Sequence, residues 1–172
     1  KYDKGKWKNY YIFYAVENPL NLKRIRRNYT YKQRESKSLD LSKTTLKGVE
    51  LIGAHLEKAN LSDAHLEKAN LSEAHLEKAN LTGTHLEGAL LGVTHLEETY
   101  LIGAYFEGVK FVFACLKGAD LRVADLRGAF GLSPGELSKV KTLYKAELDD
   151  ELRLPLEQEY PTLFNEPDLG MF

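Results

Sequence analysis

Five histidines recur at ten-residue intervals: His55, His65, His75, His85 and His95. Each lies one residue before a leucine and two before a glutamate, as in His55-Leu56-Glu57. Imidazole and carboxylate groups ligate zinc, and histidine changes charge near neutral pH. A simpler explanation is that a ten-residue unit beginning AHLEKANLS was copied in tandem, so that its histidine recurs with it. We therefore expect no metal site and no cofactor.

The remaining reactive side chains form no catalytic pattern. The sequence marks out no Ser/His/Asp or Cys/His set, and it holds no glycine-rich loop of the kind that cradles phosphates. Cys115 is the single cysteine, which excludes an internal disulfide framework. We expect a protein that is not an enzyme and that has no catalytic residues.

A strict five-residue period positions these histidines. Every fifth residue from Leu41 to Leu126 is Leu or Phe, at eighteen positions, and the residue two places earlier is Ala in eleven of them. Five helical steps would advance each leucine by about 140°, and an odd period in one strand would alternate its faces. The period instead predicts short extended pieces separated by corners, with positions i−2 and i pointing inward. Repeated, these pieces form an all-β solenoid filled with Leu and Ala.

The predicted core centres are the Leu and Phe residues of fifteen consecutive repeats. They are Leu56, Leu61, Leu66, Leu71, Leu76, Leu81, Leu86, Leu91, Leu96, Leu101, Phe106, Phe111, Leu116, Leu121 and Leu126.

The sequence of the repeats resembles the A-[D/N]-L-x-x signature of pentapeptide-repeat proteins. The matching stretches are AHLEKANLSDAHLEKANLSEAHLEKANLTGTHLEG (54–88) and GADLRVADLRGAF (118–130). The resemblance implies a right-handed, four-sided (quadrilateral) β-helix of twenty residues per coil. Eighteen repeats then form about four and a half coils, roughly 22 Å long at about 4.8 Å per coil. The segment after residue 130 is similar to the C-terminal helical tails of bacterial members.

Twenty residues per coil would stack outward side chains in rows. His55, His75 and His95 would form one row, and His65 and His85 a second row on the opposite side. A straight row on a flat side does not bring ligands together around one ion, which disfavours a metal site. Mutual repulsion within each row predicts a loss of stability as the histidines become protonated below about pH 6.5.

One outward group breaks the polar pattern of the solenoid. Leu90 and Val93 are followed one coil later by Val112 and Phe113 on the same side. Grouped apolar side chains on a surface indicate a buried interface more often than a bare face. The candidate occupants are the chain's own C-terminal helix, a second copy in a homodimer, and an unrelated protein partner.

Composition divides the chain into three parts. Residues 1–38 form a segment rich in aromatic residues, with 11 basic and 3 acidic side chains. Residues 39–131 form the repeat β-helix with a net charge of −4 over 39–130, and residues 132–172 form a C-terminal helical cap and tail. The basic segment fits either a cap on the first coil or a juxtamembrane stretch. It contains no recognisable nucleic-acid module, and we expect no nucleic-acid partner.

The C-terminal part opens with a helix start signal. Ser133 suits an N-cap, Pro134 the first helical position, and Glu136 completes a capping box. A single helical stripe then predicts a helix through residue 148: Leu137, Val140, Tyr144 and Leu148. A second short helix is expected from Asp149 or Asp150. These helices would cap the open end of the solenoid.

These observations predict a non-enzymatic protein-interaction module built on a rigid rod. The longest uncharged run, residues 88–96, is too short to span a membrane, so we expect a cytoplasmic protein. Membrane tethering would require sequence before Lys1, and a cytoplasmic rod of such a protein is one alternative. Some relatives implied by the resemblance mimic DNA and bind DNA gyrase, which is a second alternative. The weak negative charge of this solenoid disfavours it.

Overall fold

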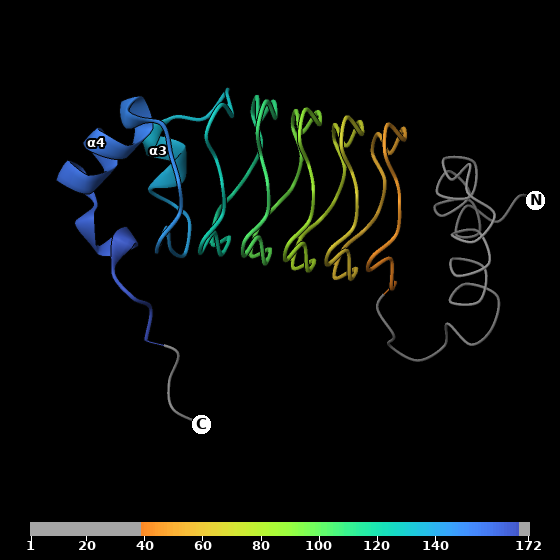
Figure 1. The fold of residues 1–172 in the computed structure, drawn as a ribbon, viewed down its shortest axis with the longest axis horizontal. Helices are drawn as coiled ribbons and strands as arrows, with labels where there is room; N and C mark the ends of the chain where they lie inside the picture. The colour runs from red at the N-terminus through yellow and green to blue at the C-terminus, as the bar shows by residue number, and fades with distance from the viewer. Residues whose placement is uncertain (1–38, 169–172) are drawn as a thin grey trace, which may run out of the picture.

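The computed structural model describes residues 39–168, so the expectations for residues 1–38 lie outside the described part. Stacked coils follow one another along the rod, and the C-terminal helices lie at one end (Figure 1). Residues twenty apart pair in parallel, as in His55 with His75 and Asn60 with Asn80. Because successive pairs begin five residues apart, each coil has four short sides, which agrees with the expected solenoid.

Hydrogen bonds between coils satisfy the backbone of every side. On one side, the Leu61 amide donates to the carbonyl of Asn80 at 2.7 Å, and the Asn80 amide donates to the carbonyl of Ala59 at 2.8 Å. The Asp63 amide donates to the carbonyl of Thr82 at 2.9 Å. Each side of a coil thus pairs with the next coil through a single β-bridge. The stacking of many coils supplies the backbone pairing that longer strands supply in an ordinary β-sheet.

A tight turn forms each corner. The Ala64 amide donates back to the carbonyl of Leu61 at 3.1 Å, and the residue two after the core centre takes a positive φ, for example 53° at Asp63. Glycine occupies eight corners of the repeat, including Gly83 at φ 64°, because it adopts this conformation without a Cβ clash.

The interior is a column of Leu, Phe and small residues. Each of the fifteen expected core centres is at most 3% exposed. Phe106 and Phe111 pack with ring centroids 5.3 Å apart. Where threonine replaces alanine, its hydroxyl is satisfied: Thr84 Oγ1 donates to the carbonyl of Leu61 at 2.8 Å.

The helix expected through residue 148 is wrong beyond its first turn. α3 (Pro134–Leu137) begins with the expected capping box between Ser133 and Glu136, and then the chain returns to the solenoid. Thr142 pairs with Asp120, and Glu147 pairs with Asp125, so the spacing is twenty-two residues. Leu143 and Leu148 are buried, as core centres are, while Tyr144 lies half-buried outside. The unpaired backbone of the preceding coil outweighs helix propensity here, because it offers ready hydrogen-bond partners.

The last elements lie over this final partial coil. α4 (Asp150–Glu159) begins at the expected residue, and η1 (Pro161–Phe164) follows it. Leu156 of α4 is fully buried, and the Leu143 amide donates to the carbonyl of Leu163 at 2.7 Å. Between residues 39 and 168, no helix has both the length and the apolar character needed to cross a membrane.

We predict that Leu143→Ala destabilises the protein as strongly as Leu76→Ala does. Both side chains are fully buried, so each truncation should leave a cavity that lowers the free energy of unfolding by about 2–5 kcal/mol. Urea denaturation followed by circular dichroism measures this loss. The control is Leu154→Ala in α4, where the leucine is 56% exposed and the cost should be below about 1 kcal/mol. If Leu143→Ala were as mild as Leu154→Ala, residues 140–148 would not belong to the core.

Candidate interaction surface

Four apolar side chains lie together on the outside of two neighbouring coils. Leu90 and Val93 belong to one coil, and Val112 and Phe113 belong to the next; we call these four residues the apolar face. Leu90 is half-buried, whereas Val93 is 49%, Val112 43% and Phe113 77% exposed. An aromatic side chain exposed to this degree carries a large unfavourable contact with water. The face is therefore a candidate for burial against another surface.

The chain's own C-terminal helix does not cover this face. α4 directs Leu156 into the end of the core and packs against α3 and η1. Val93 and Phe113 stay exposed although α4 is folded against the end of the rod. Of the three occupants that the sequence suggested, the C-terminal helix is thus absent from the face in this structure.

The corners of the apolar face carry unusual residues. Val93 has φ 57° and Phe113 has φ 60°, in the left-handed region that bulky residues rarely adopt. Most equivalent corners elsewhere carry glycine or a charged residue, such as Lys78 at φ 60°, and Val123 at φ 57° is the further exception. A β-branched side chain at such a corner reduces stability, so the repeat fold alone gives no reason for Val93.

Two charged residues border the apolar face. Lys110 lies on the same side, in the row of Leu90 and Phe130, and its Nζ is 5.6 Å from the centroid of the Phe130 ring. Glu73 occupies the corner one coil before Val93 and is exposed. Sequence reasoning missed Phe130 and both charges as part of this surface, although the twenty-residue spacing from Leu90 to Lys110 and Phe130 could have revealed the row.

The histidines stack in the two expected rows. Neighbouring rings of His55, His75 and His95 lie 4.6–4.7 Å apart and nearly parallel. On the opposite side, His65 stacks on His85, which stacks on Tyr105. The spacing is that of the coils, so the rows follow from the ten-residue unit.

Each histidine also lies beside the glutamate two residues later. The distance from Nδ1 of the ring to the carboxylate is 2.8 Å for His55 and Glu57, and 3.2 Å for His75 and Glu77. The second oxygen, Oε2, of Glu77 is buried and accepts no hydrogen bond from the described residues. These pairs were not expected, and they bring a negative charge closer to each ring than its stacked neighbour.

One group in the described part could be considered for a metal ion. Ligand atoms of His75, Glu77 and His95 all lie within 4.8 Å of one another. The two rings are parallel within 4°, so their nitrogen lone pairs run side by side and do not converge on one point. Since tetrahedral zinc requires converging donors about 2.0–2.1 Å from the ion, this arrangement does not favour a metal centre.

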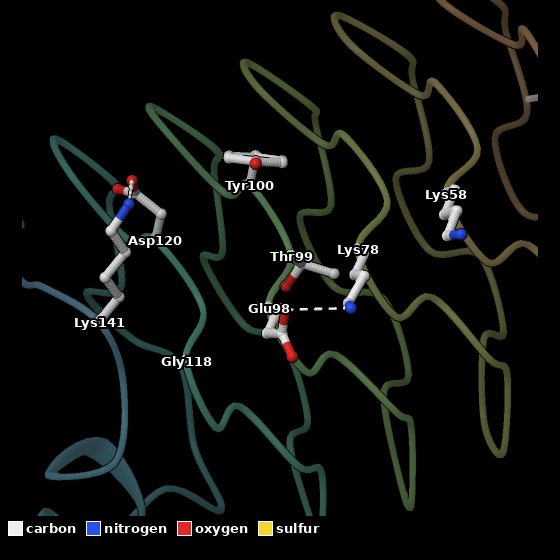
Figure 2. Close-up of a pocket in the computed structure, with 8 residues that line it drawn as sticks. All are labelled: Lys58, Lys78, Glu98, Thr99, Tyr100, Gly118, Asp120 and Lys141. Atoms are coloured by element: carbon white, nitrogen blue, oxygen red, sulfur yellow. Dashed lines mark ion pairs between the residues drawn. The ribbon is translucent and has the colours of Figure 1, made fainter. Parts of the chain in front are cut away.

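A shallow polar hollow of about 410 Å³ lies along another corner (Figure 2). Its buried carboxylate, Asp120, binds Arg122 Nε at 2.8 Å and lies 3.6 Å from Lys141 Nζ. Lys78 and Glu98 form a second ion pair across it at 3.3 Å. The hollow is mixed in charge, and the pair between Lys141 and Asp120 joins the last partial coil to the rod. It was missed because Lys141 reaches Asp120 only through the twenty-two-residue spacing.

The histidine pairing generates a prediction for acidic pH. Burial alone would raise the pKa of Glu57, but hydrogen bonds from His55 and the backbone lower it below its ordinary value of 4.5, and the pKa of Glu67 is lowered similarly. Folding thus favours the ionised carboxylates, which adds stability above pH 4.5 that is lost as the pH falls further. We expect Glu57→Gln with Glu67→Gln to reduce the fall in melting temperature between pH 5 and about pH 3.5. An undiminished fall would contradict this assignment.

Comparison with known proteins identifies the repeat. The sequence profile described as "Pentapeptide repeats" matches eight copies, over residues 59–92 and 94–129. No curated protein matches the chain. Among solved structures, the chain is similar to the pentapeptide repeat protein Rfr23 from the cyanobacterium Cyanothece 51142. The identity is 30%, covering 70% of this chain and 67% of that one, with a TM-score of 0.38.

Two further structures are similar at lower identity. A pentapeptide repeat protein from the thylakoid lumen of Arabidopsis thaliana is 23% identical, covering 74% of this chain and 81% of that one, with a TM-score of 0.36. QnrB1, described as a plasmid-mediated fluoroquinolone resistance protein, is 18% identical, covering 80% of this chain and 77% of that one, with a TM-score of 0.27. Pentapeptide-repeat proteins fold as right-handed β-helices and are generally non-enzymatic structural repeat proteins. With eight matched copies and a relative at 30% identity, this chain belongs to the pentapeptide-repeat family.

Proposed function

We propose that the chain is a non-enzymatic protein-interaction module whose rod presents the apolar face to a protein partner. The proposal rests on the exposure of Phe113 and Val93. These side chains lie on neighbouring coils, and the C-terminal helix does not cover them. Monomeric proteins expose large apolar groups mainly where they bind something.

We also propose that the rod has about four and a half regular coils followed by a partial coil and a C-terminal cap. Support comes from Leu143 and Leu148, which extend the interior past the last regular repeat, and from Leu156, which α4 buries at its end. Such a cap would hide the apolar cross-section that an open solenoid leaves exposed. Association would then occur through the sides, where the apolar face lies.

A rigid scaffold suits this role, because little of it would lose conformational freedom when a partner binds. The apolar face is held on both coils by inter-coil hydrogen bonds, such as that from the Val93 amide to the carbonyl of Val112 at 2.8 Å. A preformed surface loses less conformational entropy on association than a flexible one. This advantage partly offsets the small size of the face.

The test is affinity capture from a lysate of the source cells with Phe113→Glu as the disrupting variant. Glutamate already occupies the equivalent corner at Glu73 and Glu98, with φ 60° and 56°, so the fold should tolerate it. The matched control is Val123→Glu, which makes a similar change at an exposed corner of a different side. We expect wild-type protein and the control to retain a bound protein that Phe113→Glu loses. Equal capture by all three would contradict a binding role for the apolar face.

A further inference from the structure

We propose that the polar hollow beside Tyr100 binds an organic phosphate that carries a flat ring, such as a nucleoside monophosphate. The hollow measures about 410 Å³, which lies within the range of about 300–1,000 Å³ typical of small-molecule sites. It lies on the opposite side of the rod from the apolar face, because ten residues, half a coil, separate Leu90 from Tyr100. The site is therefore independent of the proposed function, and a partner on the apolar face leaves it open.

The charges that line the hollow favour an anion. Three lysines and two carboxylates line it: Lys58, Lys78, Lys141, Glu98 and Asp120. Asp120 is already bound by Arg122, whose Nε lies 2.8 Å from Oδ1, so the ammonium groups outnumber the carboxylates that remain for them. Lys58 has no hydrogen-bond or ion-pair partner among the residues that the structure describes. Lys58 and Lys78 occupy the same corner of neighbouring coils, about 4.8 Å apart along the rod, so one phosphate group can accept hydrogen bonds from both.

Tyr100 supplies a flat surface for the ring of the ligand. Its side chain is 49% exposed, and Figure 2 shows the tyrosine ring edge-on over the stretch between Asp120 and Lys78. Gly118 follows Glu98 in the row of corners, and its lack of a side chain keeps the hollow open: a Cβ there would lie 3.3 Å from Glu98 Cγ. Nucleobases stack on exposed tyrosine rings, since every base has a π face.

The end of the hollow away from Lys58 holds a buried acceptor. The side chain of Asp120 is 3% exposed, and its Oδ2 atom accepts no hydrogen bond from the described residues. Lys141 Nζ lies 3.6 Å from this oxygen, which is longer than a good hydrogen bond. Because Lys141 is exposed, an amino or hydroxyl group of the ligand can take its place and satisfy Oδ2. The hollow thus offers a phosphate site, a stacking surface and a hydrogen-bond acceptor in order along the rod, as a nucleotide requires.

Titration of the isotope-labelled full chain, followed by the NMR shifts of its backbone amides, tests the site. The probes are adenosine monophosphate, adenosine and inorganic phosphate, each added to about 10 mM. Because the hollow is shallow, we expect a dissociation constant of about 0.1–1 mM for adenosine monophosphate, with shifts at Glu98, Tyr100 and Gly118. Adenosine and phosphate should each bind at least about tenfold more weakly, since each makes only part of the contacts.

One pair of variants tests the phosphate contact. Lys58→Glu reverses a charge that lines the hollow, and Lys68→Glu is the matched control, because Lys68 occupies the opposite corner with φ 58° against 60° at Lys58. Both corners should accept glutamate, since Glu73 and Glu98 have φ 60° and 56° at equivalent corners. We expect Lys58→Glu to weaken the binding of adenosine monophosphate at least about fivefold, and Lys68→Glu to leave it within about twofold of wild type.

A second pair of variants tests the stacking. Tyr100→Asn removes the ring, and Asn80 in the same row one coil earlier shows that asparagine fits there. The control is Tyr105→His, because His85 holds the equivalent position in the row of Tyr105. We expect Tyr100→Asn to weaken the binding of adenosine monophosphate at least about fivefold without changing that of inorganic phosphate, and Tyr105→His to change neither.

Three results would overturn the proposal. The first is a spectrum in which Tyr100 and Gly118 do not shift with adenosine monophosphate up to about 10 mM. The second is inorganic phosphate that binds as tightly as adenosine monophosphate, with Tyr100→Asn without effect, because the hollow would then hold an anion and no ring. The third is an equal loss from Lys58→Glu and Lys68→Glu, which would indicate attraction by the overall charge of the rod.

Discussion

The hydrogen-bonded register between coils is the constraint on which the rest of the structure depends. Each side contacts the next coil through a single bridge, such as Asn60 with Asn80, flanked by hydrogen bonds of 2.7–2.9 Å. A slip of one residue would turn the inward positions outward and place leucines in water. Twenty residues per coil are thereby enforced, and every corner must reverse the chain within the same few residues. The positive φ at the corners, the small residues at i−2 and the stacked surface rows all follow from this requirement.

Much of the fold could be predicted because the core and the corners each leave a direct mark on the sequence. The five-residue recurrence of leucine has no other compact solution, and the corner glycines have the positive φ that this solution needs. Residues 138–148 were misassigned because two patterns coincide there. Leu137, Val140, Tyr144 and Leu148 share a helical stripe, yet Leu143 and Leu148 also keep the five-residue spacing. The backbone of the preceding coil decided between them, and local sequence does not reveal that partner.

The candidate surface was only partly predictable for a similar reason. The sequence predicts that Val93, Val112 and Phe113 point outward, because each follows a core centre by one or two residues. Whether α4 folds back over them depends on where Leu156 finds its most favourable burial, which is a tertiary question. The pairing of each histidine with its glutamate was also missed, since the sequence shows that both side chains point outward but not that they meet. In this chain the sequence thus predicts which way a side chain points better than it predicts which other side chains it contacts.

The ten-residue unit has a geometric consequence, because it is half of a twenty-residue coil. Gain or loss of one unit would lengthen or shorten the rod by half a coil and rotate everything after it by half a turn relative to what precedes it. Two units would change the length by one whole coil and restore the original phase. The apolar face and α4 both follow the tandem units, so they would rotate together as one block. Whether the number of units is odd or even therefore decides which of two opposite directions that block faces, relative to the residues before the units.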